Sequence, residues 1–136
     1  MSHQDLISQS ANALVARLRA GEISPHDCLD ALEARIAKVE SKVNALPILC
    51  FDRARAHADA LMKKPAAERG LLAGLPVPIK DLSWVKGVRS TSGSPLFADF
   101  VPDSSDILVD KLEDEGGVVY AKSNTPEFGA GGSTFN

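Results

Sequence analysis

The sequence predicts an α/β fold in which N-terminal helices are followed by the first strands of a mixed, largely parallel sheet. Apolar residues recur at helical spacing through residues 1–64, whereas residues 65–136 contain two short apolar runs with a helical segment between them. A strand, a crossover helix and a second strand form a parallel pair. Because parallel sheets normally have several strands and are covered on both faces, we expect the sheet to be incomplete in this chain.

Capping and turn residues divide the chain into its expected elements. Ser8 or Ser10 can cap a first helix that ends at Gly21, and Ser24 followed by Pro25 opens a second helix. Next we expect a buried strand over 45–51 and an alanine-rich helix over 52–64. A strand over 77–80 should lead into a loop over 81–103. The remaining elements are expected to be a helix capped by Ser104 or Ser105 that ends at Gly116 and Gly117, a strand over 118–121 and a glycine-rich loop over 123–136.

Composition and charge narrow the class of protein. The 15 basic and 18 acidic residues give a net charge of −3 without a Lys/Arg cluster, which argues against a nucleic-acid partner. No run approaches the roughly 18 apolar residues of a membrane span, and the N-terminus lacks a secretory pattern. Cys28 and Cys50 lie in apolar segments without metal-ligand spacing, so we expect reduced thiols in a cytoplasmic protein. The three histidines are isolated, and no metal site is predicted.

Residues 74–81 (GLPVPIKD) carry the strongest candidate for chemistry. Val77 and Ile79 alternate with prolines and Lys80 follows directly, so we expect Lys80 to end a short, buried strand. Burial favours the uncharged amine, and a lysine held in this way can act as a base near neutral pH. Asp81 is adjacent, but consecutive strand residues face opposite sides, so we expect a structural acceptor rather than a partner that keeps Lys80 charged.

Along essentially its whole length, the chain resembles the amidase signature family of serine amide hydrolases. The matching segments are, in order, 20–25 (AGEISP), 74–81 (GLPVPIKD), 91–94 (TSGS), 116–119 (GGVV) and 123–129 (SNTPEFG). The resemblance implies that residues 1–136 are the N-terminal part of one amidase domain, with a mainly helical region over 1–64 and a strand–loop–helix–strand core over 65–136 that carries the lysine motif.

The resemblance also implies a catalytic triad of a serine nucleophile, a second serine on a cis peptide bond and a lysine, which corresponds to Lys80. Both serines are expected beyond the matched region, so the chain by itself should lack the nucleophile and be inactive. Residues 131–134 (GGST) look like the family's serine loop but directly follow the 124–129 segment, so Ser133 is not favoured as the nucleophile. The tail is either a frayed end or, by the family analogy, a wall of the substrate cavity built from the small residues Gly129, Ala130, Gly131 and Gly132.

The leading hypothesis is therefore an amidase-type hydrolase of carbon–nitrogen bonds in small carboxamides, without a metal or an organic cofactor. Expected partners are the substrate, the remainder of the same enzyme or further copies of the chain, and neither nucleic acid nor membrane. One alternative is a truncated, non-catalytic binding or assembly module or remnant. A second is the A subunit of a glutamine-forming amidotransferase. Residues 124–129 favour the broad amidase branch, since the amidotransferase branch usually has Met and Asp after the Asn.

Overall fold

A computed structural model describes residues 3–134 of the chain. Its helices are α1 (His3–Ile7), α2 (Ala11–Ala20), α3 (Pro25–Val43), α4 (Phe51–Met62) and α5 (Ile107–Asp114). The strands are β1 (Ile48–Leu49), β2 (Pro76–Lys80) and β3 (Val118–Ser123), and the short 3₁₀ turns are η1 (Ala66–Glu68), η2 (Pro95–Phe97) and η3 (Glu127–Gly129). The predicted α/β class is confirmed.

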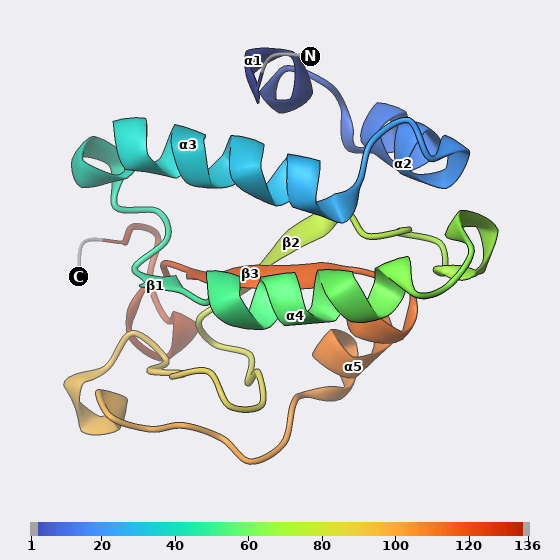
Figure 1. Cartoon of the computed structure of the whole chain (residues 1–136). Coiled ribbons are helices and arrows are strands. Elements are labelled where there is room, and N and C mark those ends of the chain that lie inside the picture. Colours follow the sequence, from blue (N-terminus) through green and yellow to red (C-terminus); the bar gives the residue numbers. More distant parts are fainter. Residues whose placement is uncertain (1–2, 135–136) are drawn as a thin grey trace.

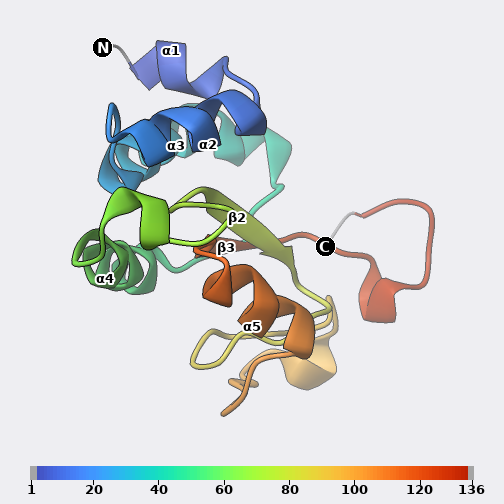
Figure 2. The same cartoon turned by 90° about the vertical axis from the view of Figure 1, so that its right-hand side faces the viewer.

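Helices cover both faces of the small sheet (Figures 1 and 2). On one face, Leu29 of α3, Ala58 of α4 and Tyr120 of β3 belong to a single buried cluster. On the other face, Val119 of β3 packs with Val109 of α5 and with apolar residues of the 81–106 loop. Apolar burial on both faces of β3 explains why its sequence is an almost continuous apolar run. No helix within residues 3–134 is long and apolar enough to cross a membrane.

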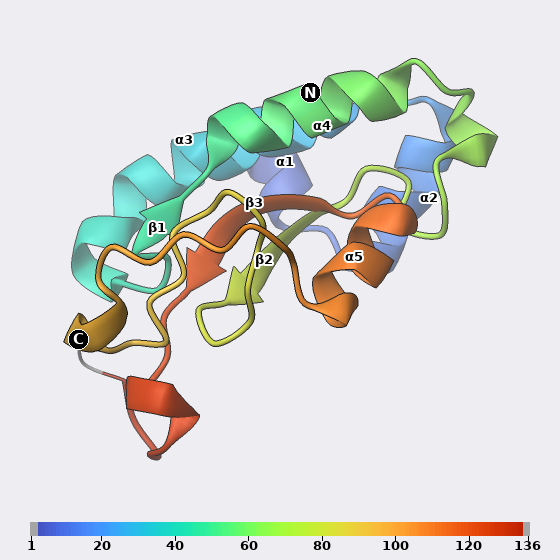
Figure 3. The ribbon, with the colours of Figure 1, turned by 90° about the horizontal axis from the view of Figure 1, so that it is seen from below.

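The sheet has the order β1–β3–β2, so β3 lies in the centre. β2 runs parallel to β3, as predicted, and β1 runs antiparallel to it. Pro76 and Pro78 lack the N–H that a central strand needs, and they are tolerated because β2 is an edge strand of this sheet. Lys80 is paired with Ser123, so the carboxyl ends of the two parallel strands meet at one edge, where the 81–106 loop and the segment after β3 also lie (Figure 3).

The predicted helix starts are confirmed where a side chain caps the backbone. Ser10 caps α2, and Gly21 ends it in the left-handed conformation with φ +70°. At α3, the Ser24 hydroxyl accepts a hydrogen bond from the Asp27 N–H at 3.1 Å, and the Asp27 carboxylate accepts one from the Ser24 N–H at 2.7 Å. This reciprocal pair is a capping box, and Pro25 takes the first helical position, where its missing N–H is not needed.

Two sequence predictions about element boundaries are wrong. The buried strand expected over 45–51 is reduced to two residues, because Phe51 already begins α4 and Leu49 remains 47% exposed. The cap of α5 is Asp106, not Ser104 or Ser105. The Ser105 hydroxyl instead accepts a hydrogen bond from the Lys86 N–H at 2.9 Å, so it holds the long loop and does not cap the helix.

Candidate active site at the carboxyl ends of β2 and β3

Lys80 ends β2 at this edge, and its side chain is exposed. The expected burial of Lys80 is therefore wrong for the part of the chain that the structure describes. The reason is topological: β2 is an edge strand of the described sheet. Within residues 3–134, the Lys80 ammonium makes no hydrogen bond or ion pair.

Asp81 lies on the opposite side of the strand end and is 3% exposed. Its carboxylate accepts hydrogen bonds from the Thr91 N–H at 3.1 and 3.2 Å and from the Thr91 hydroxyl. Its own N–H donates to the carbonyl of Ser123 at 2.9 Å, which extends the β2–β3 pairing by one bond. The prediction that Asp81 is a structural acceptor facing away from Lys80 is confirmed.

A second lysine, Lys122 near the end of β3, completes this cluster and was missed by the sequence reasoning. Its side chain is 0% exposed. The ammonium donates to Oδ1 of Asp81 at 2.9 Å and to the Ser90 hydroxyl at 2.8 Å. A fully buried lysine needs a carboxylate partner. The signal available in the sequence was a lysine directly after an apolar strand, with an aspartate directly after the parallel neighbour.

The loop after β2 is tied to the segment after β3. The Ser94 hydroxyl donates to Oε1 of Glu127 at 2.8 Å, and the Phe128 N–H donates to the Ser92 carbonyl at 2.8 Å. Both Ser92 and Phe128 have positive φ values, +52° and +51°. Non-glycine residues adopt this conformation only where their surroundings enforce it, and such positions are enriched at functional sites.

Two hollows adjoin these segments. One, of about 260 Å³, includes Asp81, Thr91, Ser94 and Asn124 in its wall. The other, of about 400 Å³, is lined by Gly93, Pro95, Pro126, Glu127, Ala130, Gly131, Gly132 and Ser133. Three of the four predicted substrate-binding residues thus share a hollow. Gly129 does not line it, and Lys80 lines neither hollow.

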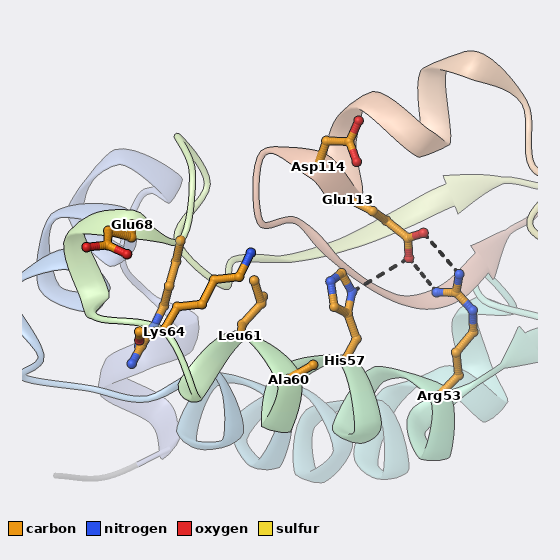
Figure 4. Close-up of a pocket in the computed structure, with 9 residues that line it drawn as sticks. Arg53, His57, Ala60, Leu61, Lys64, Glu68, Glu113 and Asp114 are labelled. Atoms are coloured by element: carbon orange, nitrogen blue, oxygen red, sulfur yellow. Dashed lines mark hydrogen bonds and ion pairs between the residues drawn. The ribbon is translucent and has the colours of Figure 1, made fainter.

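A further polar cavity, of about 540 Å³, lies between α4, η1 and α5 (Figure 4). Arg53 donates to both carboxylate oxygens of Glu113, and Nδ1 of His57 lies 3.7 Å from Oε1 of Glu113. Burial lowers the pKa of His57, while the negative charge of Glu113 opposes that shift. Glu113 precedes the amino end of β3, whereas Lys80 is paired with its carboxyl end, so this cavity is separate from the candidate active site.

The described residues offer no ready metal site. Within residues 3–134, no group of three or more His, Cys, Asp or Glu side chains could hold a metal ion. Both cysteines are free thiols; Cys28 is buried, Cys50 is partly buried, and burial raises the pKa of each to about 11.

The α/β unit gathers charged and polar side chains at the carboxyl ends of its two parallel strands, which is where ligands bind in open α/β sheets. A family model described as "Amidase" matches residues 27–136, and the chain belongs to this family. The predicted resemblance to the amidase signature family is therefore confirmed.

Curated relatives include two kinds of protein. The chain is 42% identical over 120 residues to the A subunit of the glutamyl-tRNA(Gln) amidotransferase of Synechococcus sp. (strain CC9311), covering 87% of this chain and 25% of that protein. It is 35% identical over 140 residues to an acylamidase of Rhodococcus erythropolis, covering 100% of this chain and 29% of the relative. The chain thus spans about a quarter of the length of these relatives.

Solved structures of amide hydrolases share the fold. The peptide amidase from Stenotrophomonas maltophilia superposes with a TM-score of 0.80 at 29% identity, over 89% of this chain and 26% of that one. For a 6-aminohexanoate cyclic dimer hydrolase, the TM-score is 0.82 at 29% identity, over 93% of this chain and 25% of that one. The predicted amidase signature fold is confirmed, and the chain covers about a quarter of each of these neighbours.

Proposed function

We propose that this chain is the N-terminal part of a cytoplasmic amidase that hydrolyses the carbon–nitrogen bond of small carboxamides, with Lys80 as its base. Family membership supports the reaction class. The assignment of Lys80 as the base rests on the different environments of Lys80 and Asp81 at the strand ends. Asp81, the nearest carboxylate in sequence, is occupied by Lys122 and Thr91, and Lys80 is left without an acidic partner among the described residues.

In the proposed mechanism, the neutral amine of Lys80 accepts a proton from a bridging serine, which in turn accepts the proton of the nucleophilic serine. The nucleophile attacks the amide carbonyl, the amine leaves with a proton, and water hydrolyses the acyl-enzyme. We propose that both serines lie outside these 136 residues, since the match covers only 25% of the length of the first relative. The same additional chain would cover the exposed end of β2, because burial favours the uncharged lysine that a base requires.

We propose that Ala130, Gly131 and Gly132 form one wall of the substrate site, because they line the 400 Å³ hollow next to the 91–94 loop. Their small side chains leave room for the acyl group of the carboxamide. Gly129 is assigned a different role, as the turn that directs these residues, because its φ is +72° and Leu82 packs against it.

The test is hydrolysis of simple carboxamides, followed by ammonia release, with the full-length gene product and its Lys80→Ala variant. General-base removal is expected to lower kcat by about 10²–10⁴-fold while leaving the melting temperature unchanged. Lys86→Ala is the matched control, because Lys86 is an exposed lysine on the following loop. Near-normal activity of Lys80→Ala would refute the role proposed for Lys80.

A second candidate is a component of a glutamyl-tRNA(Gln) amidotransferase, which the 42% identity to such a protein favours. Thr125 and Pro126 favour the hydrolase, since the amidotransferase branch usually has Met and Asp after Asn124. Pull-down of the full-length protein separates the two. Stoichiometric partner proteins and a preference for glutamine would support the amidotransferase. A self-sufficient protein active on other carboxamides would support the hydrolase.

A non-catalytic module or remnant is the remaining candidate. The exposed outer edge of β2 and apolar side chains such as Leu96 and Ile107, exposed by 81% and 80%, would then serve association. A full-length protein without activity on any carboxamide, which nevertheless forms a defined complex, would support this alternative.

A further inference from the structure

The buried pair of Asp81 and Lys122 links the strand that carries Lys80 to both loops of the candidate site. Asp81 directly follows Lys80, and its N–H is held by the Ser123 carbonyl of β3 at 2.9 Å. The end of β2 is thus fixed through its backbone by Ser123 and through the Asp81 side chain by Lys122. The main freedom left to Lys80 is the rotation of its own side chain.

The hydrogen bonds of this cluster are complementary. Oδ1 of Asp81 accepts from Lys122 and from the Thr91 N–H, and Oδ2 accepts from the Thr91 N–H and hydroxyl. The Ser90 hydroxyl accepts from Lys122 and donates to the Val88 carbonyl at 3.1 Å. The carboxylate oxygens are therefore directed toward Lys122 and Thr91, away from Lys80.

From Thr91, the contacts continue to the 400 Å³ hollow. The Thr91 hydroxyl accepts from the Gly93 N–H at 3.1 Å, and the Thr91 carbonyl accepts from the Ser94 N–H at 3.0 Å. Ser94 in turn holds Glu127, and both Gly93 and Glu127 line the hollow. One continuous set of hydrogen bonds therefore joins the buried lysine to the wall of the hollow.

We propose that Lys122 and Asp81 are positioning residues for the reaction. In this role, Lys122 neutralises Asp81, so that Asp81 does not form an ion pair with Lys80. The pair also fixes the direction in which Lys80 leaves β2 relative to the 91–94 loop and the hollow behind it. This inference rests on the proposed function of Lys80 as the base.

The experiment compares Lys122→Met, which keeps the length of the side chain but leaves Asp81 without its counter-charge, with Thr91→Val, which keeps the shape of Thr91 but removes its hydroxyl. Both are made in the full-length protein, with Lys86→Met as the control. Misplacement of reacting groups by about 1 Å lowers rates by about 100-fold, so we expect kcat to fall by about that factor while KM changes little. Thr91→Val preserves both buried charges and keeps the test valid if Lys122→Met fails to fold.

Hydrogen exchange provides a readout that does not depend on activity. If the pair positions the loops, folded Thr91→Val exchanges faster at the amides of Gly93, Ser94 and Phe128, while the helical core is unchanged. Folded Lys122→Met also loses global stability, so its exchange should accelerate more at these three amides than in the helical core. Unchanged exchange at these amides overturns the inference, and so does an unchanged kcat in a folded variant. An inactive wild-type protein, or an active Lys80→Ala variant, would instead refute the proposed function. In that case, the hydrogen-exchange measurement still tests by itself whether the pair positions the loops.

Discussion

Nζ of Lys122 lies 2.9 Å from Oδ1 of Asp81, across the carboxyl ends of two parallel strands and 41 residues apart in sequence. Two lysines therefore occupy neighbouring strand ends with opposite environments. Lys122 is fully buried and paired, whereas Lys80 is exposed. The lysine that the sequence motif brings to attention is not the one that the fold buries.

The buried pair of Asp81 and Lys122 predicts that substitutions of these two residues have strongly non-additive effects on the free energy of unfolding. Lys122→Met or Asp81→Asn alone should lower the free energy of unfolding by about 3–5 kcal/mol, because each leaves the partner's polar group buried without its counter-charge. The double variant should lose much less than the sum of the two single effects. Urea denaturation of the three variants measures this coupling, and simple additivity would contradict it.

Among the glycines after β3, substitution of Gly129 should affect stability, whereas substitution of Gly132 should affect substrate binding. Gly129 has φ +72°, and an added Cβ would lie 2.9 Å from Cδ2 of Leu82, so Gly129→Ala should lower stability by about 1–3 kcal/mol. Gly132 has open space around it and lines the hollow. Gly132→Ala is therefore a stability-neutral control, whereas Gly132→Leu should raise KM for carboxamides without changing the melting temperature. Equal loss of stability at both positions would contradict this assignment.

His57 predicts a loss of stability in mildly acidic solution. Burial lowers its pKa below the ordinary value of 6.5, so in the intervening pH range the unfolded chain binds more protons than the folded one. Stability should therefore fall as the pH decreases through 6.5 and level off below the lowered folded value. The change should be smaller in His57→Gln. Melting temperatures recorded between pH 8 and pH 5 measure it, and identical pH profiles for the two proteins would refute the contribution of His57.

The thiols should be unreactive in the folded protein. Burial raises the pKa of Cys28 and Cys50 to about 11, so only a very small fraction is thiolate at neutral pH. Alkylation by iodoacetamide at pH 7.5 is expected to be slow for both and to accelerate when urea unfolds the chain. Mass spectrometry of the alkylated peptides follows each thiol separately. Rapid modification of the native protein would contradict this expectation.

The sequence predicted the elements that depend on nearby residues. Ser24, Pro25 and Asp27 lie within four positions of one another and specify the start of α3, and Gly21 specifies the end of α2. Prediction was poorer where a side chain had two uses. Ser105 and Asp106 both had the chemistry of a helix cap, but their oxygens accept hydrogen bonds from the loop at Lys86 and Trp84.

The amino-acid sequence by itself determined the α/β class, the parallel pairing of the two main strands, the family and the opposite orientations of Lys80 and Asp81. The family was identified from motif segments that resemble it, whereas the class, the pairing and the side-chain orientations follow from capping, periodicity and side-chain alternation, which act over a few residues. Only the tertiary structure decided which lysine is buried, which groups the Asp81 carboxylate binds and which glycines line a hollow. Those outcomes depend on strand order and register, which bring Asp81, Ser90 and Lys122 into contact from separate segments of the chain.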